Sequence, residues 1–192
     1  MSVAVILDFA GGDRARYDTV TTAMGLVGEL APGERVHVAG PYADGWRIVD
    51  VWESQERYER FRDEQILPQT QAVGVSPTRV RVVDVDDEMP DDGRGPGFLQ
   101  CVILPGLDRA AFRRLHSELL VGGHRPPGLT WHVNGPWRSG WCVLDAWVTR
   151  ESRERFMERI SPMIGAAPLS GPPRIEELAV ETALHSRMGV AI

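Results

Sequence analysis

The chain repeats itself at an interval of 95 residues. When the sequence is compared with itself at that offset, Val3–Phe61 aligns with Phe98–Phe156 without a gap, and 19 of the 59 aligned positions are identical. Eight of the identities fall within 16 consecutive positions and include uncommon residue types. The matched pairs with chemical potential are His37/His132, Trp46/Trp141, Asp50/Asp145 and Trp52/Trp147. We interpret this pattern as an internal duplication, which predicts two copies of one folding unit.

An acidic segment rich in Pro and Gly separates the two copies. Residues 86–97 have no apolar periodicity, which is typical of a linker. The sequence therefore predicts one repeat at 1–85, a linker at 86–97, a second repeat at 98–182 and a C-terminal tail at 183–192.

Each copy is predicted to fold in the order strand, helix, strand, strand, helix, strand. The helices are marked by capping residues, Asp13 and Ser54 in the first copy and Asp108 and Thr149 in the second. In the first copy the expected strands are Val3–Leu7, Arg35–Ala39, Trp46–Trp52 and Arg79–Val85. This βαββαβ order is the ferredoxin-like unit, so the predicted class is α+β. One such unit leaves a sheet face uncovered, and we expect the two units to pack sheet to sheet within the chain.

Composition excludes several classes of function. The net charge of −6 argues against a nucleic-acid or membrane-surface partner, and the absence of Lys excludes Schiff-base chemistry. Cys101 and Cys142 lie in apolar runs and are expected to be buried free thiols. The N-terminus lacks the features of a signal peptide, and no apolar run is long enough to span a bilayer. These features predict a cytoplasmic protein.

Polar side chains gather on one face of the predicted sheet in each copy. Alternation along Trp46–Trp52 places Trp46, Ile48, Asp50 and Trp52 on the same face. A six-residue turn, Gly40–Gly45, would place His37 opposite Ile48 and therefore on that face. The same arrangement in the second copy groups His132, Asn134, Trp141, Asp145 and Trp147. We expect a pocket at this face, although each His/Asp pair could instead be a structural polar pair within the sheet.

The segment Asp50-Val-Trp-Glu-Ser54, a strand that ends in Trp and enters a Ser-capped helix, resembles the antibiotic biosynthesis monooxygenase family. That family belongs to the dimeric α/β-barrel superfamily, which contains cofactor-free oxygenases of aromatic polyketides, polyketide cyclases and haem-degrading enzymes. The resemblance implies an intramolecular version of this barrel and a pocket lined by Trp52 and Tyr58. The family's Asn four residues before the Trp is replaced by Ile48 here. In the second copy only Trp147 of this set is present.

No cofactor or metal is predicted. Haem-degrading members of the superfamily place a ligating His on the helix after the conserved Trp, and neither copy has one there. The five His show no spacing typical of a metal site on one helix, and no Cys-x-x-Cys occurs. His124, in a loop, is expected to be exposed.

The second copy carries the larger set of candidate catalytic groups. His116 replaces Thr21 on the inward face of the first helix, and Asn134 replaces Ala39. We predict a cofactor-independent oxygenase or cyclase that acts on an aromatic or polyketide-like molecule. His116 or His132 would abstract a proton, with Asp145 tuning the base and Asn134 and the Trp147 indole stabilising the product anion.

Further substrate contacts are predicted for Trp131, Trp137, Trp141, His37, Asp50, Trp52 and Tyr58. The alternative is a non-catalytic module that binds or senses a small molecule with the same pockets. In either case the expected assembly is a monomer with pseudo-two-fold symmetry, or a homodimer of such units.

Overall fold

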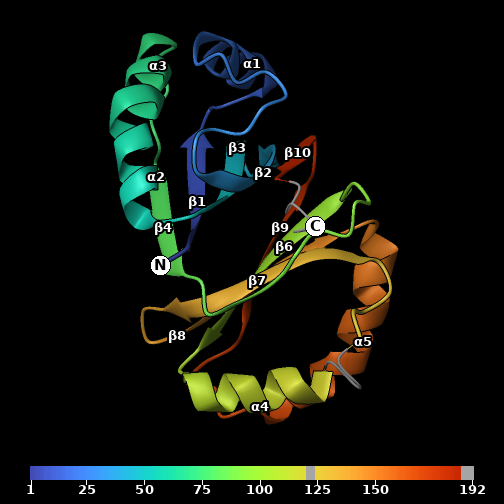
Figure 1. The fold of residues 1–192 in the computed structure, drawn as a ribbon. Helices are drawn as coiled ribbons and strands as arrows, with labels where there is room; N and C mark the ends of the chain where they lie inside the picture. Colours follow the sequence, from blue (N-terminus) through green and yellow to red (C-terminus); the bar gives the residue numbers. More distant parts are fainter. Residues whose placement is uncertain (120–123, 187–192) are drawn as a thin grey trace, which may run out of the picture. The chain divides into compact units, whose positions relative to one another are not determined.

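The computed structural model describes residues 1–119 and 124–186 and separates into two compact units (Figure 1). The first unit comprises residues 1–82 together with the C-terminal segment from Ala179, and the second comprises residues 83–178. Most of the predicted tail, residues 187–192, lies outside the described residues.

The first unit is a five-stranded sheet in the order β10-β2-β3-β1-β4. Its strands are β1 Val3–Ala10, β2 Glu34–Tyr42, β3 Gly45–Trp52, β4 Arg79–Asp84 and β10 Thr182–His185. Strands β2, β3, β1 and β4 have the neighbour order of a ferredoxin-like unit. The apolar face formed by Val3, Val5 and Leu7 of β1 packs in one core with Ala31, Trp52, Tyr58 and Ile66.

Helices cover that face of the first sheet. They are α1 Arg14–Ala23, α2 Gln55–Phe61, a π-helical segment η1 Arg62–Ile66, and α3 Leu67–Ala72. As predicted, Asp13 caps α1 by accepting a hydrogen bond from the Arg16 amide, and Ser54 caps α2 through the Arg57 amide.

The second unit has the same plan in the order β5-β7-β8-β6-β9. Its elements are β5 Asp87–Met89, β6 Phe98–Pro105, α4 Arg109–Leu119, β7 Leu129–Trp137, β8 Gly140–Trp147, α5 Arg150–Ala166 and β9 Arg174–Ala179. Strands β6 to β9 start and end 95 residues after β1 to β4. The fold class is therefore α+β with two ferredoxin-like units, as predicted. The predicted sheet-to-sheet packing of these units stays a prediction.

Two short edge strands differ from the expected boundaries. Strand β5 lies inside the predicted linker and pairs with β7. Strand β10 runs from the last residue of the predicted second repeat into the predicted tail and pairs with β2. Neither segment has the apolar alternation of a strand with one buried face. Their pairing comes instead from backbone groups at the open edge of a sheet.

The hairpin between β2 and β3 is tighter than predicted. Only Ala43 and Asp44 form the turn, with Ala43 at φ 51°, and the strands continue through Tyr42 and Gly45. His37 consequently pairs with Asp50 and not with Ile48. The predicted register was wrong by two residues, and because side chains alternate with a period of two, His37 still lies on the predicted face.

Other predictions concern single residues. Cys101 and Cys142 are buried and not joined in a disulfide, and His124 is exposed, as expected. Among residues 1–119 and 124–186, no helix combines the length and apolar character needed to cross a lipid bilayer.

Candidate functional site

Each unit holds a cavity between its sheet and its helices. The space at the first cavity measures about 760 Å³ and that at the second about 590 Å³, and both figures include open solvent at the mouth. Both are lined mainly by apolar side chains with a few polar groups, which is the composition of small-molecule pockets. His37, Asp50, Trp46 and Trp52 line the first.

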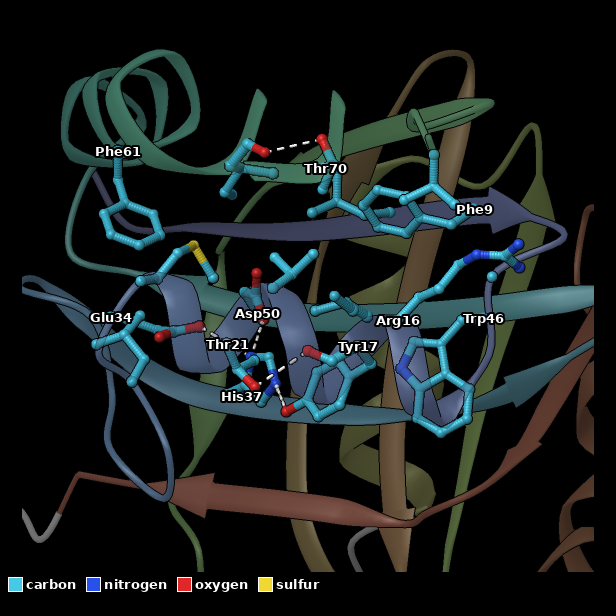
Figure 2. A pocket seen from close by; sticks show the side chains of 18 of the residues that line it. Phe9, Arg16, Tyr17, Thr21, Glu34, His37, Trp46, Asp50, Phe61 and Thr70 are labelled. Carbon is cyan, nitrogen blue, oxygen red and sulfur yellow. Dashed lines mark hydrogen bonds and ion pairs between the residues drawn. The ribbon is translucent and has the colours of Figure 1, made fainter. Parts of the chain in front are cut away.

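A cluster of polar groups lies at one wall of the first cavity (Figure 2). Nδ1 of His37 lies 2.9 Å from Oδ1 of Asp50 and 3.2 Å from Oε1 of Glu34. On the other side of the ring, Nε2 of His37 lies 2.8 Å from the Tyr17 hydroxyl. The two carboxylates are almost fully buried, so His37 is held between a carboxylate pair and a phenol.

The electrostatics of this cluster favour a charged imidazole. Burial alone would lower the pKa of His37, but hydrogen bonds from its ring to Asp50 and Glu34 and their negative charge outweigh it and raise the pKa well above 6.5. Burial, followed by the charge of Glu34, raises the pKa of Asp50 to about 7. A protonated His37 cannot accept a proton, so it is unsuited to act as a general base.

Two Trp side chains form part of the first cavity wall. Trp46 and Trp52 line it, and their indole N–H groups are buried without a hydrogen-bond partner in the described part of the chain. Tyr58 packs against Trp52, with ring centroids 6.0 Å apart, but it is buried behind the wall and does not line the cavity. Trp52 and Tyr58, the pair predicted from the family resemblance, are therefore adjacent, but only Trp52 faces the cavity.

In the second unit a chain of hydrogen bonds fixes the state of His132. The Trp141 indole N–H, which can only donate, reaches Oδ1 of Asn134 at 3.0 Å. The Asn134 amide N–H₂ must then point at Nε2 of His132, 2.9 Å away, so Nε2 accepts. Nδ1 of His132 carries the proton and donates it to Asp145 at 2.6 Å. This network selects a neutral His132 whose free lone pair is already engaged by Asn134.

His116 is the polar group of this cavity that is open to a ligand. Its ring stacks on His132, with centroids 5.0 Å apart, and on Phe112 at 5.3 Å. It lines the cavity, and no hydrogen bond joins it to another described residue. Burial lowers the pKa of His116, so its imidazole is neutral and able to accept a proton at neutral pH.

Five predicted site residues of the second unit lie away from the cavity lining. Asn134 is buried between His132 and Trp141, and Trp147 packs with Phe98, Leu129 and Phe156. Trp131 pairs with Ala146, so it is on the sheet face opposite Asp145. Trp137, at the end of β7, stacks with Arg138, whose guanidinium carbon lies 4.5 Å from its ring. Trp141 is fully buried against Phe112.

Two residues of the first cavity, Glu34 and Tyr17, were not predicted as site residues. Positions three apart on a regular strand point to opposite faces, which hides the relation between Glu34 and His37. A register shift between Glu34 and Val36 breaks this alternation and brings both side chains to the same face. Tyr17 reaches the cluster from α1, and its hydroxyl lies 2.8 Å from Nε2 of His37.

Comparisons with known proteins return structural matches only. No family model matches the chain, and no curated protein sequence matches it. Solved structures that match include a proposed monooxygenase of Fusobacterium nucleatum, 12% identical, covering 96% of this chain and 94% of the other, with a TM-score of 0.72.

Two further solved structures cover nearly the whole chain. One is an anthrone oxidase-like protein that is 14% identical. The match covers 96% of this chain and 93% of that protein, with a TM-score of 0.55. A ferredoxin-fold protein of Listeria monocytogenes, related to antibiotic biosynthesis monooxygenases, is 10% identical, covers 95% of each chain and has a TM-score of 0.59. The chain shares their fold. At these identities the likeness concerns the fold and leaves the chemistry to the residues of each site.

Proposed function

We propose that the protein is an enzyme that acts on an aromatic or polyketide-like small molecule without an organic cofactor, and that the reaction begins when His116 abstracts a proton. The observation that carries the proposal is the state of His116, a neutral imidazole that faces an apolar cavity with both ring nitrogens available. A base with these properties is suited to remove the proton of a phenol or of an acidic C–H.

The neighbours of His116 support this role. His132 stacks on the His116 ring and is itself fixed by Asp145 and Asn134, so it restrains the base without competing for the substrate proton. His132 and Asp145 are therefore assigned a positioning role, and His116 the catalytic one. Exclusion of water by the apolar wall favours the reaction of the resulting carbanion with dioxygen or with a carbonyl of the same molecule.

Fold likeness to monooxygenases and to an anthrone oxidase-like protein is compatible with the oxygenase branch of this proposal. We also attribute the correspondence of elements 95 residues apart to duplication of one ancestral unit. Duplication would leave one pocket free to change while the other kept its chemistry.

A binding role is the second candidate, and it is favoured by the first unit. Its cavity is the larger one, and Trp46 and Trp52 line it with flat aromatic side chains suited to a flat ligand. In this alternative the chain would bind an aromatic compound without turnover.

The test is turnover of hydroxylated anthrones and related polyketides, with and without dioxygen, followed by mass spectrometry. The matched variant is His116→Thr, because Thr21 occupies the same position in the first unit. Loss of a general base lowers a rate by roughly 10²–10⁴-fold, and we expect that loss while binding of the compound persists. Binding of the same compounds without any turnover would favour the second candidate, and near-normal turnover by His116→Thr would exclude His116 as the base.

A further inference from the structure

The cluster Glu34, His37 and Asp50 in the first unit has no complete counterpart in the second. His132 and Asp145 repeat two of its members, but Leu129 stands where the first unit has Glu34. The first unit thus has two carboxylates and an imidazole at a place where the second has one carboxylate and an imidazole. A structural His/Asp pair does not require a second carboxylate, whereas a cation site gains a third ligand from it.

The spacing of the three groups suits a metal ion. One ligand atom from each side chain can be chosen so that all three lie within 4.8 Å of one another. Ligand atoms about 2.1 Å from one ion lie about 3.0 Å apart at right angles and about 3.4 Å apart in a tetrahedron. The distances from Nδ1 of His37 to the two carboxylate oxygens, 2.9 and 3.2 Å, fall close to this range.

Outer contacts hold two of the three groups in place. Oε2 of Glu34 accepts a hydrogen bond of 2.8 Å from the Ala31 amide, which leaves Oε1 directed at His37. Nε2 of His37 can donate to the Tyr17 hydroxyl at 2.8 Å, which leaves Nδ1 for the ion. Metal-binding His residues are generally oriented in this way, by a hydrogen bond at the ring nitrogen that does not bind the metal.

The two carboxylates of the cluster share a single cationic partner among the described residues. In the described part of the chain, His37 is the one positively charged partner of either Glu34 or Asp50. In the second unit, by contrast, Oδ2 of Asp145 accepts a hydrogen bond from the Gln100 amide at 3.0 Å. The position of Gln100 is Val5 in the first unit, which offers Asp50 no such donor.

We propose that Glu34, His37 and Asp50 form a binding site for one divalent transition-metal ion at the wall of the first cavity. Imidazole and carboxylate ligands together suit ions such as Zn²⁺ and Mn²⁺. Three protein ligands leave coordination positions for water or for an oxygen of a bound molecule, because the cluster lines the cavity. The site is in the other unit from His116, so it stands or fails independently of the proposed reaction.

The experiment is titration of metal-free protein with Zn²⁺ and with Mn²⁺ in competition with a chromophoric chelator, together with elemental analysis after dialysis. We expect one ion per chain. Glu34→Leu, which installs the residue of the second unit, and Asp50→Asn should each weaken binding by roughly 100-fold or more. The matched control Asp145→Asn removes the equivalent carboxylate of the second unit and should leave affinity unchanged.

Two measurements keep the test decisive if a variant folds poorly. Circular dichroism identifies such a variant, and Co²⁺ added to the unmodified protein should give a visible absorption band that Zn²⁺ displaces. Absence of any bound ion in the unmodified protein would overturn the proposal. So would an equal loss of affinity in Asp145→Asn, or full retention of the ion by folded Glu34→Leu and Asp50→Asn.

Discussion

Replacement of Asn134 by Ala tests whether this residue orients its neighbours or stabilises a reaction intermediate. The substitution removes two hydrogen bonds, of 3.0 Å from the Trp141 indole and 2.9 Å to Nε2 of His132. Both partner atoms are buried and would lose their partners. One orphaned buried polar group costs about 1–3 kcal/mol, so for two groups we expect a loss of about 2–6 kcal/mol in the free energy of unfolding.

The first unit suggests that the true cost lies toward the lower end of this range. There Ala39 occupies the position of Asn134, and the N–H of Trp46 is natively without a partner among the described residues. Urea unfolding followed by circular dichroism and Trp fluorescence measures the loss. The double variant Asn134→Ala/Trp141→Phe should be less destabilised than the sum of the single changes, because it removes one orphaned donor.

An opposite result would refute this assignment. If Asn134 stabilises an anion in the reaction, its loss should lower the rate by about 10²–10³-fold and change stability by less than about 1 kcal/mol. A stable Asn134→Ala variant with a large loss of turnover would therefore return Asn134 to a catalytic role.

Four further outcomes can be measured. Asp8→Asn should cost about 3–5 kcal/mol of unfolding free energy, because Asp8 accepts hydrogen bonds of 2.5 and 2.9 Å from the buried Arg47. Burial opposes the charged form of Asp8, but its Arg partners outweigh burial and lower its pKa below 3.8. Its contribution to stability is therefore present above pH 4 and is lost as the pH falls through the lowered pKa, which acid unfolding of the unmodified protein and of Asp8→Asn should show. If His116 is the base, kcat/KM should rise with pH and reach half its plateau below pH 6.5, since the pKa of His116 is lowered; a midpoint above 7 would contradict this. Ser54→Ala and Thr149→Ala should each cost about 1 kcal/mol through loss of a helix cap, measured by thermal unfolding. Purified protein should show neither flavin nor haem absorption; a yellow colour or a Soret band would disprove cofactor independence.

The fold could be predicted from the sequence because its signals are local and repeated. The caps at Asp13 and Ser54 and the alternation along β3 depend on neighbouring residues. Each of these signals occurs again 95 residues later, in the second copy. The error in the hairpin register did not spread to the site, because it was an even number of residues and preserved the face of His37.

The candidate site was only partly predictable, because its details depend on tertiary geometry. The bulge that turns Glu34 toward His37 has no clear local signature, and the partner that engages Asn134 becomes evident only when Trp141 is placed beside it. Trp131 was predicted as a ligand contact from its residue type, although its odd position relative to His132 places it on the other face of the strand. Residue type predicted which chemistry is possible, and packing decided which groups can perform it.

The pairing of β10 with β2 has a consequence for biosynthesis. His37 pairs with Leu184, roughly 150 positions later in the chain, a separation that favours slow, late formation of this contact. Residue 37 leaves the ribosome long before residue 184. Until β10 has been synthesised, β2 is therefore an open edge strand of the first sheet. Leu184 also lines the cavity that holds His37. The cavity of the first unit is therefore completed only after Leu184 has been synthesised, later than the strands that form its other walls.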